Sequence, residues 1–535
     1  MGIPSFYRHL VKTNPSLIRQ KCDKLPSVLA LDLNCAIYHC LAKLQKKMPF
    51  RGSERAAFED ALIKMVIQYI VKLRDHVQPT DLLYVAVDGV VPMAKIRQQR
   101  MRRFKSVWVS AEEARIKGTA DIGWDRNAIT PGTAFMDLLT ERLHTWAAGQ
   151  VGKCSVVISG VDECGEGEQK IMSYLRGLNG GVKGEIVVYG LDADLIILCL
   201  WHLETYGWSF KLLREEVEMR GGVKLNDRGE ENLLYFDIDK LALVLKDKWP
   251  TISTKDYVAA MSFLGNDFVP HGLTLCIRED GIDKLMEILV QIGRPLIVFS
   301  DGAWVYDIGV LEGVLSAVSL REEKWVLASL AKKLKMSAHS ARSFGSARGT
   351  NVEETEVEKE LGIMNMLPVS WKVEKVMCGR GQDSWYLMDG WSDIYYEQFL
   401  WGCKPEDAVK EWLTAVQWIL NYYTGCKPVN MLWYYPWYLP PLFSDILKYK
   451  PSVSSSTDYD SGYNPINPLS QLIMVLPIES YGLLPSNKRQ LPYKNPEYFP
   501  KAWTFFSAGR RMLWECEPMI PMLPFTVVEC FLQKI

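Results

Sequence analysis

The sequence predicts an α/β fold in which a central, mainly parallel sheet is flanked by helices. Short apolar runs of strand length recur along the N-terminal part of the chain at Ser27–Leu31, Leu82–Val87, Cys154–Ser159 and Glu185–Tyr189, and we expect fully buried strands there. Between the first two runs, apolar residues at three- and four-residue steps from Phe58 to Val77 predict an amphipathic helix. Strand–helix–strand alternation favours a parallel sheet with helices on both faces.

Composition excludes several classes of protein. The 535 residues carry 62 Lys and Arg against 63 Asp and Glu, so a uniformly basic surface for nucleic acid is excluded, although a local basic patch is not. Hydrophobic residues make up 48% of the chain, which excludes wholesale disorder. No charge-free apolar run reaches the ~18 residues of a membrane helix. The 12 cysteines form no Cys-x-x-Cys pair, which argues against zinc and favours reduced thiols in an intracellular protein.

Two polar segments predict the domain organisation. Residues 335–362 are rich in Ser, Ala and Gly and then acidic, so we expect a linker or exposed loop there. It separates an N-terminal domain, residues 1–334, from a second region, residues 363–535, with a further loop near 451–467. Ten of the 18 tryptophans lie at or beyond Trp371, so the second region is expected to be packed and aromatic-rich.

Acidic residues follow each of the predicted strands. Because ligands of open parallel sheets lie outside the carboxyl ends of the strands, these side chains are expected to share one crevice. The first two strands are followed by one Asp each, the third by a Glu-Gly-Glu at a helix start, and the fourth by an Asp-Ala-Asp; a later helical segment carries one more Asp. The seven carboxylates are Asp32, Asp88, Glu166, Glu168, Asp192, Asp194 and Asp267.

Crowded carboxylates are costly unless cations neutralise them. Oxygen ligands without nearby His or Cys favour Mg²⁺ or Mn²⁺, and two such ions can activate water and stabilise the leaving oxygen of a phosphodiester. A single Asp after a strand is more simply interpreted as a helix cap. Four strand ends together with the two tight acidic pairs favour a two-metal site.

A basic segment begins seven residues after Asp88. It holds six cations in eleven residues with no acid among them. On a helix, Lys95, Gln99, Arg102 and Arg103 fall on one face, which can bind a phosphate by charge-assisted hydrogen bonds. The alternative is a solvated basic helix face, the usual explanation of a charge run.

Several motifs of the chain resemble those of the XRN family of 5′→3′ exoribonucleases. MGIPSFYRHL, LALDLN, AVDGVVPMAKIRQQRMRRFKS, GEGEQKIMSYLR, YGLDADLIILCL and FLGNDFVPH occur in the family's order. WLTAVQWILNYYTGCKPVNMLWYYPWYLPPLFSDI and MLWECEPMIPML resemble the family's second conserved region, so the resemblance covers nearly the whole chain.

The resemblance implies a PIN/FEN-like nuclease core with a mainly helical second region, which degrades 5′-monophosphorylated, decapped RNA processively to nucleoside monophosphates. It places the catalytic metal ligands, for two Mg²⁺ or Mn²⁺ ions, on the same seven carboxylates, and the 5′-phosphate pocket on Lys95, Gln99, Arg102 and Arg103. It also implies base stacking by a His of the first αβ unit and an aromatic residue of the second region. Tyr38 stands at the family's spacing, but a one-residue shift restores a histidine, so we assign the stacking role to His39, with Tyr38 as the alternative and Trp433 as the aromatic partner.

The resemblance and composition together predict a cytoplasmic monomer, with the nucleus as the alternative, which binds single-stranded RNA and no membrane and acts with the decapping machinery. Two rival functions remain: a flap-type structure-specific endonuclease, which shares the carboxylates, and a catalytically dead binder of RNA 5′ ends. The segment after Asp267, FVPHGLTLCIREDGIDKL, resembles the XRN pattern rather than the helical hairpin of flap enzymes.

Overall fold

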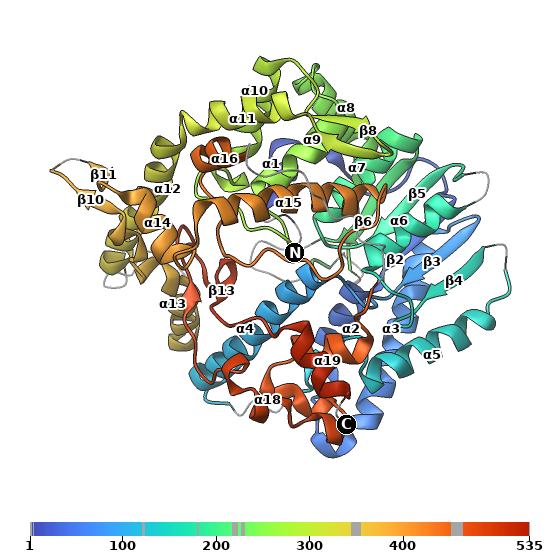
Figure 1. Cartoon of the computed structure of the whole chain (residues 1–535). Helices are drawn as coiled ribbons and strands as arrows, with labels where there is room; N and C mark the ends of the chain where they lie inside the picture. Colours follow the sequence, from blue (N-terminus) through green and yellow to red (C-terminus); the bar gives the residue numbers. More distant parts are fainter. Residues whose placement is uncertain are drawn as a thin grey trace.

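The computed structural model shows how these segments assemble (Figure 1). It describes residues 3, 5–119, 123–152, 154–178, 181–216, 223–225, 231–343, 355–382, 384–450 and 464–533.

A seven-stranded sheet forms the centre of the N-terminal part, with strand order β1-β7-β6-β5-β2-β3-β4. The strands β2, β3, β4, β5 and β6 run parallel, whereas β7 is antiparallel to both β6 and β1. The strands are β1 (Ile18–Arg19), β2 (Val28–Asp32), β3 (Leu82–Ala86), β4 (Ser155–Ser159), β5 (Glu185–Tyr189), β6 (Ser209–Glu215) and β7 (Leu233–Asp237). All four predicted strands are therefore present and the α/β prediction is confirmed.

Successive side chains of each strand point to opposite faces of the sheet, and each face is covered by its own helices. On one face, Val28 and Ala30 of β2 pack with α1 (Phe6–Thr13), α6 (Gly167–Gly177), α7 (Asp194–Tyr206) and α8 (Ile238–Lys248). On the other face, Leu29 and Leu31 pack with α2 (Leu33–Lys47), α3 (Arg55–Val77) and α5 (Ala134–Ala148). The predicted amphipathic helix is α3, so that prediction is confirmed as well.

One expectation about burial is wrong. The strand β4 is not fully buried, because it pairs only with β3 and forms the edge of the sheet. Its first residue, Ser155, is exposed and only Ile158 and Ser159 are fully buried. An apolar run alone does not distinguish an edge strand from a central one.

Helices follow the sheet and lead into the second region. These are α9 (Thr254–Ala260), α10 (Gly281–Ile292), α11 (Ile308–Ser319), α12 (Glu322–Ser343) and α13 (Glu356–Ser370), with a hairpin of β8 (Ile297–Ser300) and β9 (Ala303–Tyr306). Both ends of the expected linker 335–362 are thus helical, since α12 ends and α13 begins inside it. Its middle, residues 344–354, and most of the expected loop near 451–467 lie outside the described residues.

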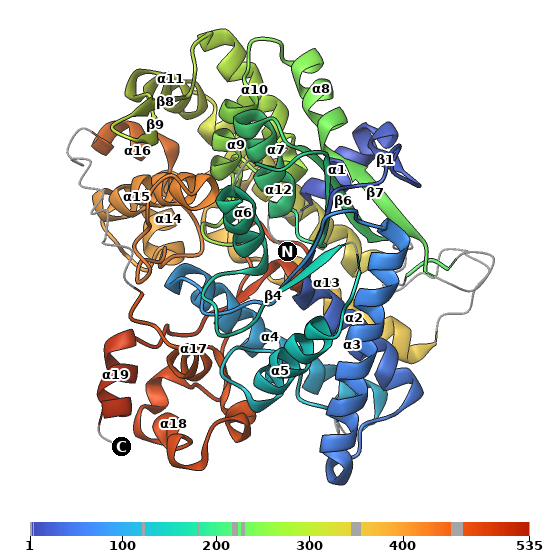
Figure 2. The ribbon, with the colours of Figure 1, turned by 90° about the vertical axis from the view of Figure 1, so that its right-hand side faces the viewer.

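The second region is mainly helical, as predicted. Its helices are α14 (Trp391–Phe399), α15 (Pro405–Thr424), α16 (Phe443–Tyr449), α17 (Pro468–Val475), α18 (Leu491–Lys494) and α19 (Phe525–Gln533), with the short pairs β10 (Cys378–Arg380)–β11 (Trp385–Leu387) and β12 (Phe505–Phe506)–β13 (Glu517–Pro518). The long helix α4 (Met93–Lys117) lies between the two regions, and α17–α19 gather beside it (Figure 2). The two regions therefore share one hydrophobic core around α4.

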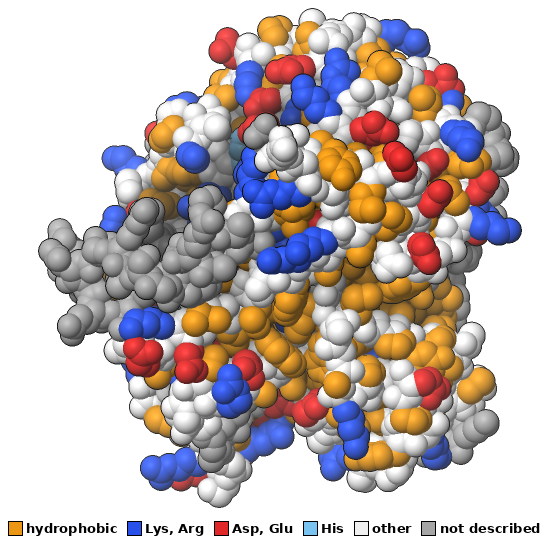
Figure 3. Space-filling view, turned by 90° about the vertical axis from the view of Figure 1, so that its left-hand side faces the viewer, with side chains coloured by type: hydrophobic (Ala, Val, Ile, Leu, Met, Phe, Trp, Pro, Cys, Tyr) orange, Lys and Arg blue, Asp and Glu red, His pale blue; other side chains and the backbone are white. Residues whose placement is uncertain are grey.

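The surface carries no continuous basic coat on the face shown in Figure 3, where Lys and Arg side chains are interspersed with Asp, Glu and hydrophobic ones. This agrees with the formal net charge of −1. Within the described part of the chain, no helix is both long enough and apolar enough to cross a membrane.

Candidate metal and nucleic-acid site

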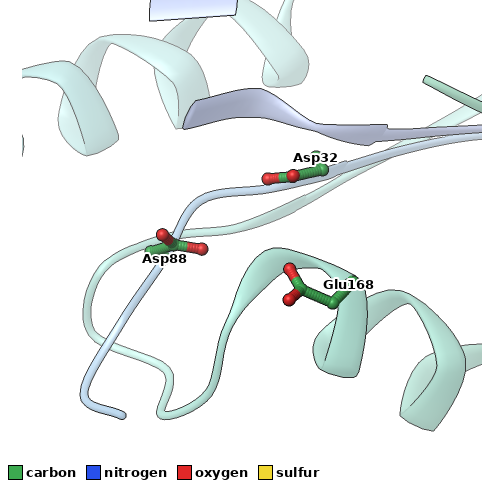
Figure 4. A group of neighbouring side chains, drawn as sticks. All are labelled: Asp32, Asp88 and Glu168. Carbon is green, nitrogen blue, oxygen red and sulfur yellow. The ribbon is translucent and has the colours of Figure 1, made fainter. Parts of the chain in front are cut away.

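Three carboxylates meet at the carboxyl ends of the parallel strands. Asp32 ends β2, Asp88 follows β3, and Glu168 stands in the first turn of α6 (Figure 4). One oxygen atom from each lies within 4.8 Å of the others. Oxygen ligands at this spacing suit a hard divalent cation such as Mg²⁺ or Mn²⁺.

Close backbone approach positions this group. A Cβ on Gly167 would lie 2.6 Å from Asp32 Oδ1, so only glycine lets α6 begin so near the end of β2. The backbone N–H of Gly167 donates to Asp88 Oδ1 at 2.8 Å, and Asn34 Nδ2 donates to the other oxygen at 2.6 Å. Asp88 is therefore held in a fixed orientation by groups from α2 and α6.

Helix capping does not explain these acids. Asp32 and Glu166 occupy the N-cap positions of α2 and α6, but neither side chain accepts a capping hydrogen bond. Asp237 shows the contrast, since it caps α8 by accepting a hydrogen bond from the Lys240 N–H at 2.9 Å. The Oδ1 atoms of Asp32 and of Asp194 are buried without a hydrogen-bond partner among the described residues. Buried oxygens of this kind suit the coordination of a divalent cation.

Lys95 connects the acidic group to α4. Its ammonium forms ion pairs with Glu166 and, at 2.9 Å, with Asp267. The Tyr422 hydroxyl at the end of α15 donates to Glu166 Oε1 at 2.7 Å. The site is thus built from the sheet, from α4 and from the second region together.

The remaining carboxylates lie beside this group. Asp192 acts electrostatically on Asp32, and Asp194 is influenced by both Asp192 and Asp267. The structure therefore brings all seven predicted carboxylates together. Asp267 differs in one detail: it stands in a bend after α9 and the short turn Met261–Leu264, not on the helix itself.

Burial and like charge shift the titration of the cluster. Desolvation, reinforced by neighbouring carboxylates, raises the pKa values of Asp32, Asp88 and Glu168. Burial and the charge of Asp267 raise the pKa of Asp194 to about 8. Burial alone would lower the pKa of Lys95, but Asp267 and Glu166 raise it well above its usual value. The positive charge that the protein supplies here is smaller than the negative charge of the carboxylates, and this excess of negative charge favours the binding of cations.

The four residues of the predicted phosphate face all lie on α4. Lys95, Gln99 and Arg103 are buried, whereas Arg102 is half-buried. Arg103 donates to Asn127 Oδ1 at 2.9 Å and leaves its Nε buried without a hydrogen-bond partner among the described residues. Lys95 is committed to the acidic cluster, so the structure places this face directly beside the carboxylates.

The other cations of the basic segment are structural. Arg100 is fully buried between the rings of Phe104 and Phe499 and donates to three backbone carbonyls of the second region. Lys105 donates to two further carbonyls, and the Arg97 guanidinium lies 5.0 Å from the centroid of the Tyr438 ring. These contacts anchor the second region on α4.

The two stacking candidates in α2 point to different surroundings. His39 Nε2 lies 2.5 Å from Glu231, in a cluster with Lys43, and its ring is 5.0 Å from the Tyr69 ring. Tyr38 is 38% exposed. Burial lowers the pKa of the Arg103 guanidinium to about 10, and the nearby Tyr38 partly counters this effect. The structure therefore places Tyr38, and not His39, beside the basic face.

Trp433 is half-buried beside α15. Its Nε1 donates to Glu411 at 2.9 Å, and its ring centroid lies 5.3 Å from that of Trp418. The backbone of Met431, two residues earlier, accepts a hydrogen bond from Met93 at the start of α4. This segment thus lies against the same helix as the basic face.

Sequence reasoning missed two site residues on α15. Tyr422 donates to Glu166, and the buried hydroxyl of Tyr423 has no hydrogen-bond partner among the described residues. Burial raises the pKa of Tyr423, and the nearby Asp194 and Asp267 raise it further. Both tyrosines stand within the apolar pattern of an ordinary amphipathic helix. Only the paired tyrosines just before the helix-ending Gly425 set this turn apart in the sequence.

An acidic group lies at the carboxyl edge of the parallel sheet, next to a basic helix face. This arrangement is typical of α/β proteins that bind divalent cations and phosphate groups. Comparison with known proteins identifies it further. Residues 1–216 match the family model described as XRN 5'-3' exonuclease N-terminus, and residues 379–532 match that described as Xrn1 helical domain. The chain belongs to the XRN family.

Curated relatives align along almost the whole chain. Human 5'-3' exoribonuclease 1 is 28% identical over 98% of this chain and 33% of its own length. The Drosophila melanogaster 5'-3' exoribonuclease 2 homolog is 26% identical over 98% of this chain and 70% of its own length, and Schizosaccharomyces pombe 5'-3' exoribonuclease 1 is 26% identical over 98% and 48%. The chain therefore spans a third to about seven tenths of the length of these relatives.

Proposed function

We propose that this protein is a metal-dependent 5′→3′ exoribonuclease that degrades 5′-monophosphorylated RNA processively to nucleoside 5′-monophosphates. The observation that carries the proposal is the junction at Lys95, where the acidic cluster meets the basic face of α4. A terminal phosphate bound on that face brings the first phosphodiester to the carboxylates. The names of the relatives support the same activity.

The residues present fit two divalent cations. Asp32, Asp88 and Glu168 would hold one ion. The other carboxylates, Glu166, Asp192, Asp194 and Asp267, would complete the two-ion site. Mg²⁺ is the cation we propose, with Mn²⁺ as a substitute; such ions supply activation of water and stabilisation of a leaving oxygen.

The chain's own groups position the substrate. Lys95 and Tyr422 orient Glu166, while Gln99, Arg102 and Arg103 bind the 5′-phosphate. Because these donors are buried or half-buried, a monophosphate fits the pocket and a cap or triphosphate is too bulky. Hydrolysis leaves a new 5′-monophosphate on the shortened RNA, which the same pocket binds again, so digestion is processive.

Stacking of the first bases completes the proposal. Trp433 remains the aromatic residue we choose in the second region, and the geometry of α2 favours Tyr38 over His39. Stacking contributes ~1–3 kcal/mol per base, so Tyr38→Ala should weaken RNA binding by about tenfold. His39→Ala is the matched control and should leave RNA binding unchanged; the reverse pattern would assign the role to His39.

The wider setting is also a proposal. We infer a nuclease domain over residues 1–334 and a second region over residues 363–535 that packs on it. We further propose a cytoplasmic monomer acting on single-stranded RNA after decapping, and the matches of the two family models lie one in each region.

The decisive experiment digests one 3′-labelled RNA with a 5′-monophosphate, a 5′-hydroxyl or a 5′-triphosphate, in Mg²⁺ and in EDTA. We expect loss of the monophosphate RNA alone, to mononucleotides, and only with Mg²⁺. The double replacement of Asp192 and Asp194 by Ala should abolish cleavage and retain RNA binding, whereas the exposed Asp389→Asn should behave as wild type. Internal cuts would favour an endonuclease, and tight binding without hydrolysis under any metal would favour a 5′-end binder.

A further inference from the structure

A cavity of about 410 Å³ lies beside the acidic cluster. Asp267 is part of its wall, together with Gln98, Arg102 and Lys105 of α4. The opposite wall is formed by the turn that carries Arg510 and by the segment from Trp514 to Pro518. Its volume is within the range of small-molecule sites.

The cavity lies on a different side of α4 from the proposed 5′-phosphate face. At 3.6 residues per turn, Gln98 and Lys105 are rotated by about a quarter turn from Lys95 and Gln99. Arg102 falls on the border between the two faces and is the one member of the phosphate face that also lines the cavity. The cavity is therefore a separate space that adjoins the phosphate pocket at Arg102.

The carboxylates of the cavity wall already have cationic partners. Asp267 pairs with Lys95, and Glu279 and Glu515 pair with Arg511 and Arg278. Glu517 lies 3.8 Å from Arg97. The negative charge of these carboxylates is thus already balanced, by partners that include the cavity-lining Arg278 and Arg511.

Two arginines that line the cavity are left without a carboxylate. In the part of the chain that the structure describes, neither Arg102 nor Arg510 has an acidic group within ion-pair distance. Arg510 is 7% exposed, and its guanidinium lies 2.9 Å from His271 Nδ1, which also lies 3.0 Å from the Gly272 carbonyl oxygen. Neither an imidazole nor a carbonyl carries a negative charge, so this contact does not neutralise the guanidinium. Glu517 acts on Arg510 only from beyond ion-pair distance, so the cost of burying this cation is partly offset, and an anion in the cavity would offset it further.

The position of Arg510 is fixed by a buried ion pair. Lys333 and Glu374 are almost fully buried and lie 2.7 Å apart. Lys333 also donates to the Ser507 carbonyl at 2.7 Å, and the Gly509 N–H donates to Glu374 at 3.0 Å. The turn is therefore held from both ends, and Arg510 faces the cavity without needing to rearrange.

A tryptophan stands at the edge of the same cavity. Trp514 is 50% exposed, and the Arg278 guanidinium lies 4.8 Å from its ring. A half-exposed indole offers a flat surface on which any nucleobase can stack. Gln98 adds a buried Oε1 without a hydrogen-bond partner among the described residues, which can accept from a sugar hydroxyl or a base amine.

We propose that this cavity is a second nucleotide site, which receives the nucleoside 5′-monophosphate released by the reaction, with its phosphate on Arg102 and Arg510 and its base on Trp514. The proposal rests on the proposed function, because hydrolysis there releases this compound beside Asp267. Arg102 lies between the two spaces and contacts the phosphate in both. Product leaves through this cavity while the shortened RNA advances into the 5′-phosphate pocket.

Calorimetric titration of AMP into the whole protein tests the site. EDTA is present, so no metal ion can bind AMP at the carboxylates. We expect two AMP per chain, one in the cavity and one in the 5′-phosphate pocket, both displaced by inorganic phosphate. Arg510→Gln should weaken AMP and phosphate binding at the cavity at least tenfold and leave the other site unchanged. Trp514→Ala should weaken AMP by about tenfold and leave phosphate unchanged, and this half-exposed position keeps the test open if the Arg510 variant does not fold.

Two controls locate the binding. Trp401→Ala removes a tryptophan of equal exposure outside the cavity and should change nothing. Arg103→Gln changes the 5′-phosphate pocket and should leave one AMP per chain, bound in the cavity; loss of all AMP binding in this variant would place AMP in that pocket alone and overturn the proposal. Absence of AMP binding to wild type, or binding unaffected by both cavity variants, would also overturn it.

The same experiments separate this inference from the proposed function. If the wild-type protein digests 5′-monophosphate RNA but does not bind AMP in EDTA, the exoribonuclease assignment stands and the second site falls. If AMP binds as described but no RNA is digested with Mg²⁺, the cavity is a nucleotide site and its role as a product route falls with the enzyme activity.

Discussion

Asp194→Asn should stabilise the metal-free protein at alkaline pH while it abolishes cleavage. Burial and Asp267 raise the pKa of this carboxyl from 3.8 to about 8 in the folded protein. The folded state therefore keeps a proton that the unfolded chain loses. The stability that comes from this proton is complete below pH 4 and is lost as the pH rises toward 8.

The size of this loss follows from the shift. A shift of about four pKa units at about 1.4 kcal/mol each gives roughly 6 kcal/mol as an upper bound. Asparagine cannot ionise, so the variant escapes this loss. The raised pKa values of Asp32, Asp88 and Glu168 act in the same direction and remain in the variant. We therefore expect a weaker dependence on pH, not its complete absence.

Urea unfolding at pH 6, 7, 8 and 9 in EDTA measures the effect. The wild-type midpoint should fall steadily with pH, and the variant's midpoint should fall less and exceed the wild type's at pH 9. Mg²⁺ should flatten the wild-type curve, because cations replace the missing positive charge. Asp389→Asn, at an exposed position, should follow the wild type. Parallel wild-type and Asp194→Asn curves in EDTA would refute the electrostatic reasoning about the cluster.

Three further substitutions test the contacts around α4 and the site. Tyr422→Phe removes the hydroxyl that donates to Glu166 at 2.7 Å, and single-turnover cleavage should slow roughly ten- to hundredfold, since a hydrogen bond to a charged group contributes ~1.5–3 kcal/mol. Arg100→Met leaves buried carbonyls without donors, so urea unfolding should show a loss of about 3 kcal/mol. Lys333→Met leaves Glu374 buried and unpaired, at a cost of about 3–5 kcal/mol, and adding Glu374→Leu should recover most of it.

Each of these variants has a matched control at an exposed or half-exposed position. Tyr493→Phe should leave cleavage unchanged, and Lys488→Met and Lys332→Met should leave the unfolding midpoint near that of the wild type. An unchanged cleavage rate in Tyr422→Phe would remove that residue from the site. A double variant at Lys333 and Glu374 no more stable than Lys333→Met alone would show that the cost is not that of an unpaired charge.

The parallel part of the sheet was predictable because each of its first four strands is a continuous apolar run. The strand β6 was not, because it reads SFKLLRE and carries Lys211 inside the sheet. The charge is accommodated by ion pairs with Asp237 and Asp239, which come from β7 and α8. A buried lysine balanced by acids that are distant in sequence resembles an exposed one, so the parallel strand β6 was missed together with the antiparallel strands β7 and β1 beyond it.

The carboxylates were predictable for a topological reason. Parallel strands end at the same edge, so residues that follow β2, β3 and β5 must lie close together. No such rule applies to Tyr422, which reaches Glu166 across 256 positions of sequence. Its placement depends on how α15 packs against the core through side chains such as Trp412 and Ile419. Contacts of this kind are properties of the tertiary fold, and a periodic pattern does not encode them.

The proposed stacking residue in α2 shows why a shift of one position along a helix matters. Shifting an alignment by one position appears small in sequence, but on a helix it turns the side chain by about 100°. Position 38 faces the basic side of α4, and position 39 faces Glu231 and the ring of Tyr69. An aromatic ring can stack on a base whether it is a tyrosine or a histidine. The residue that stacks must therefore present its ring at the correct helical angle, and the Tyr38→Ala and His39→Ala variants test our proposal that this residue is Tyr38.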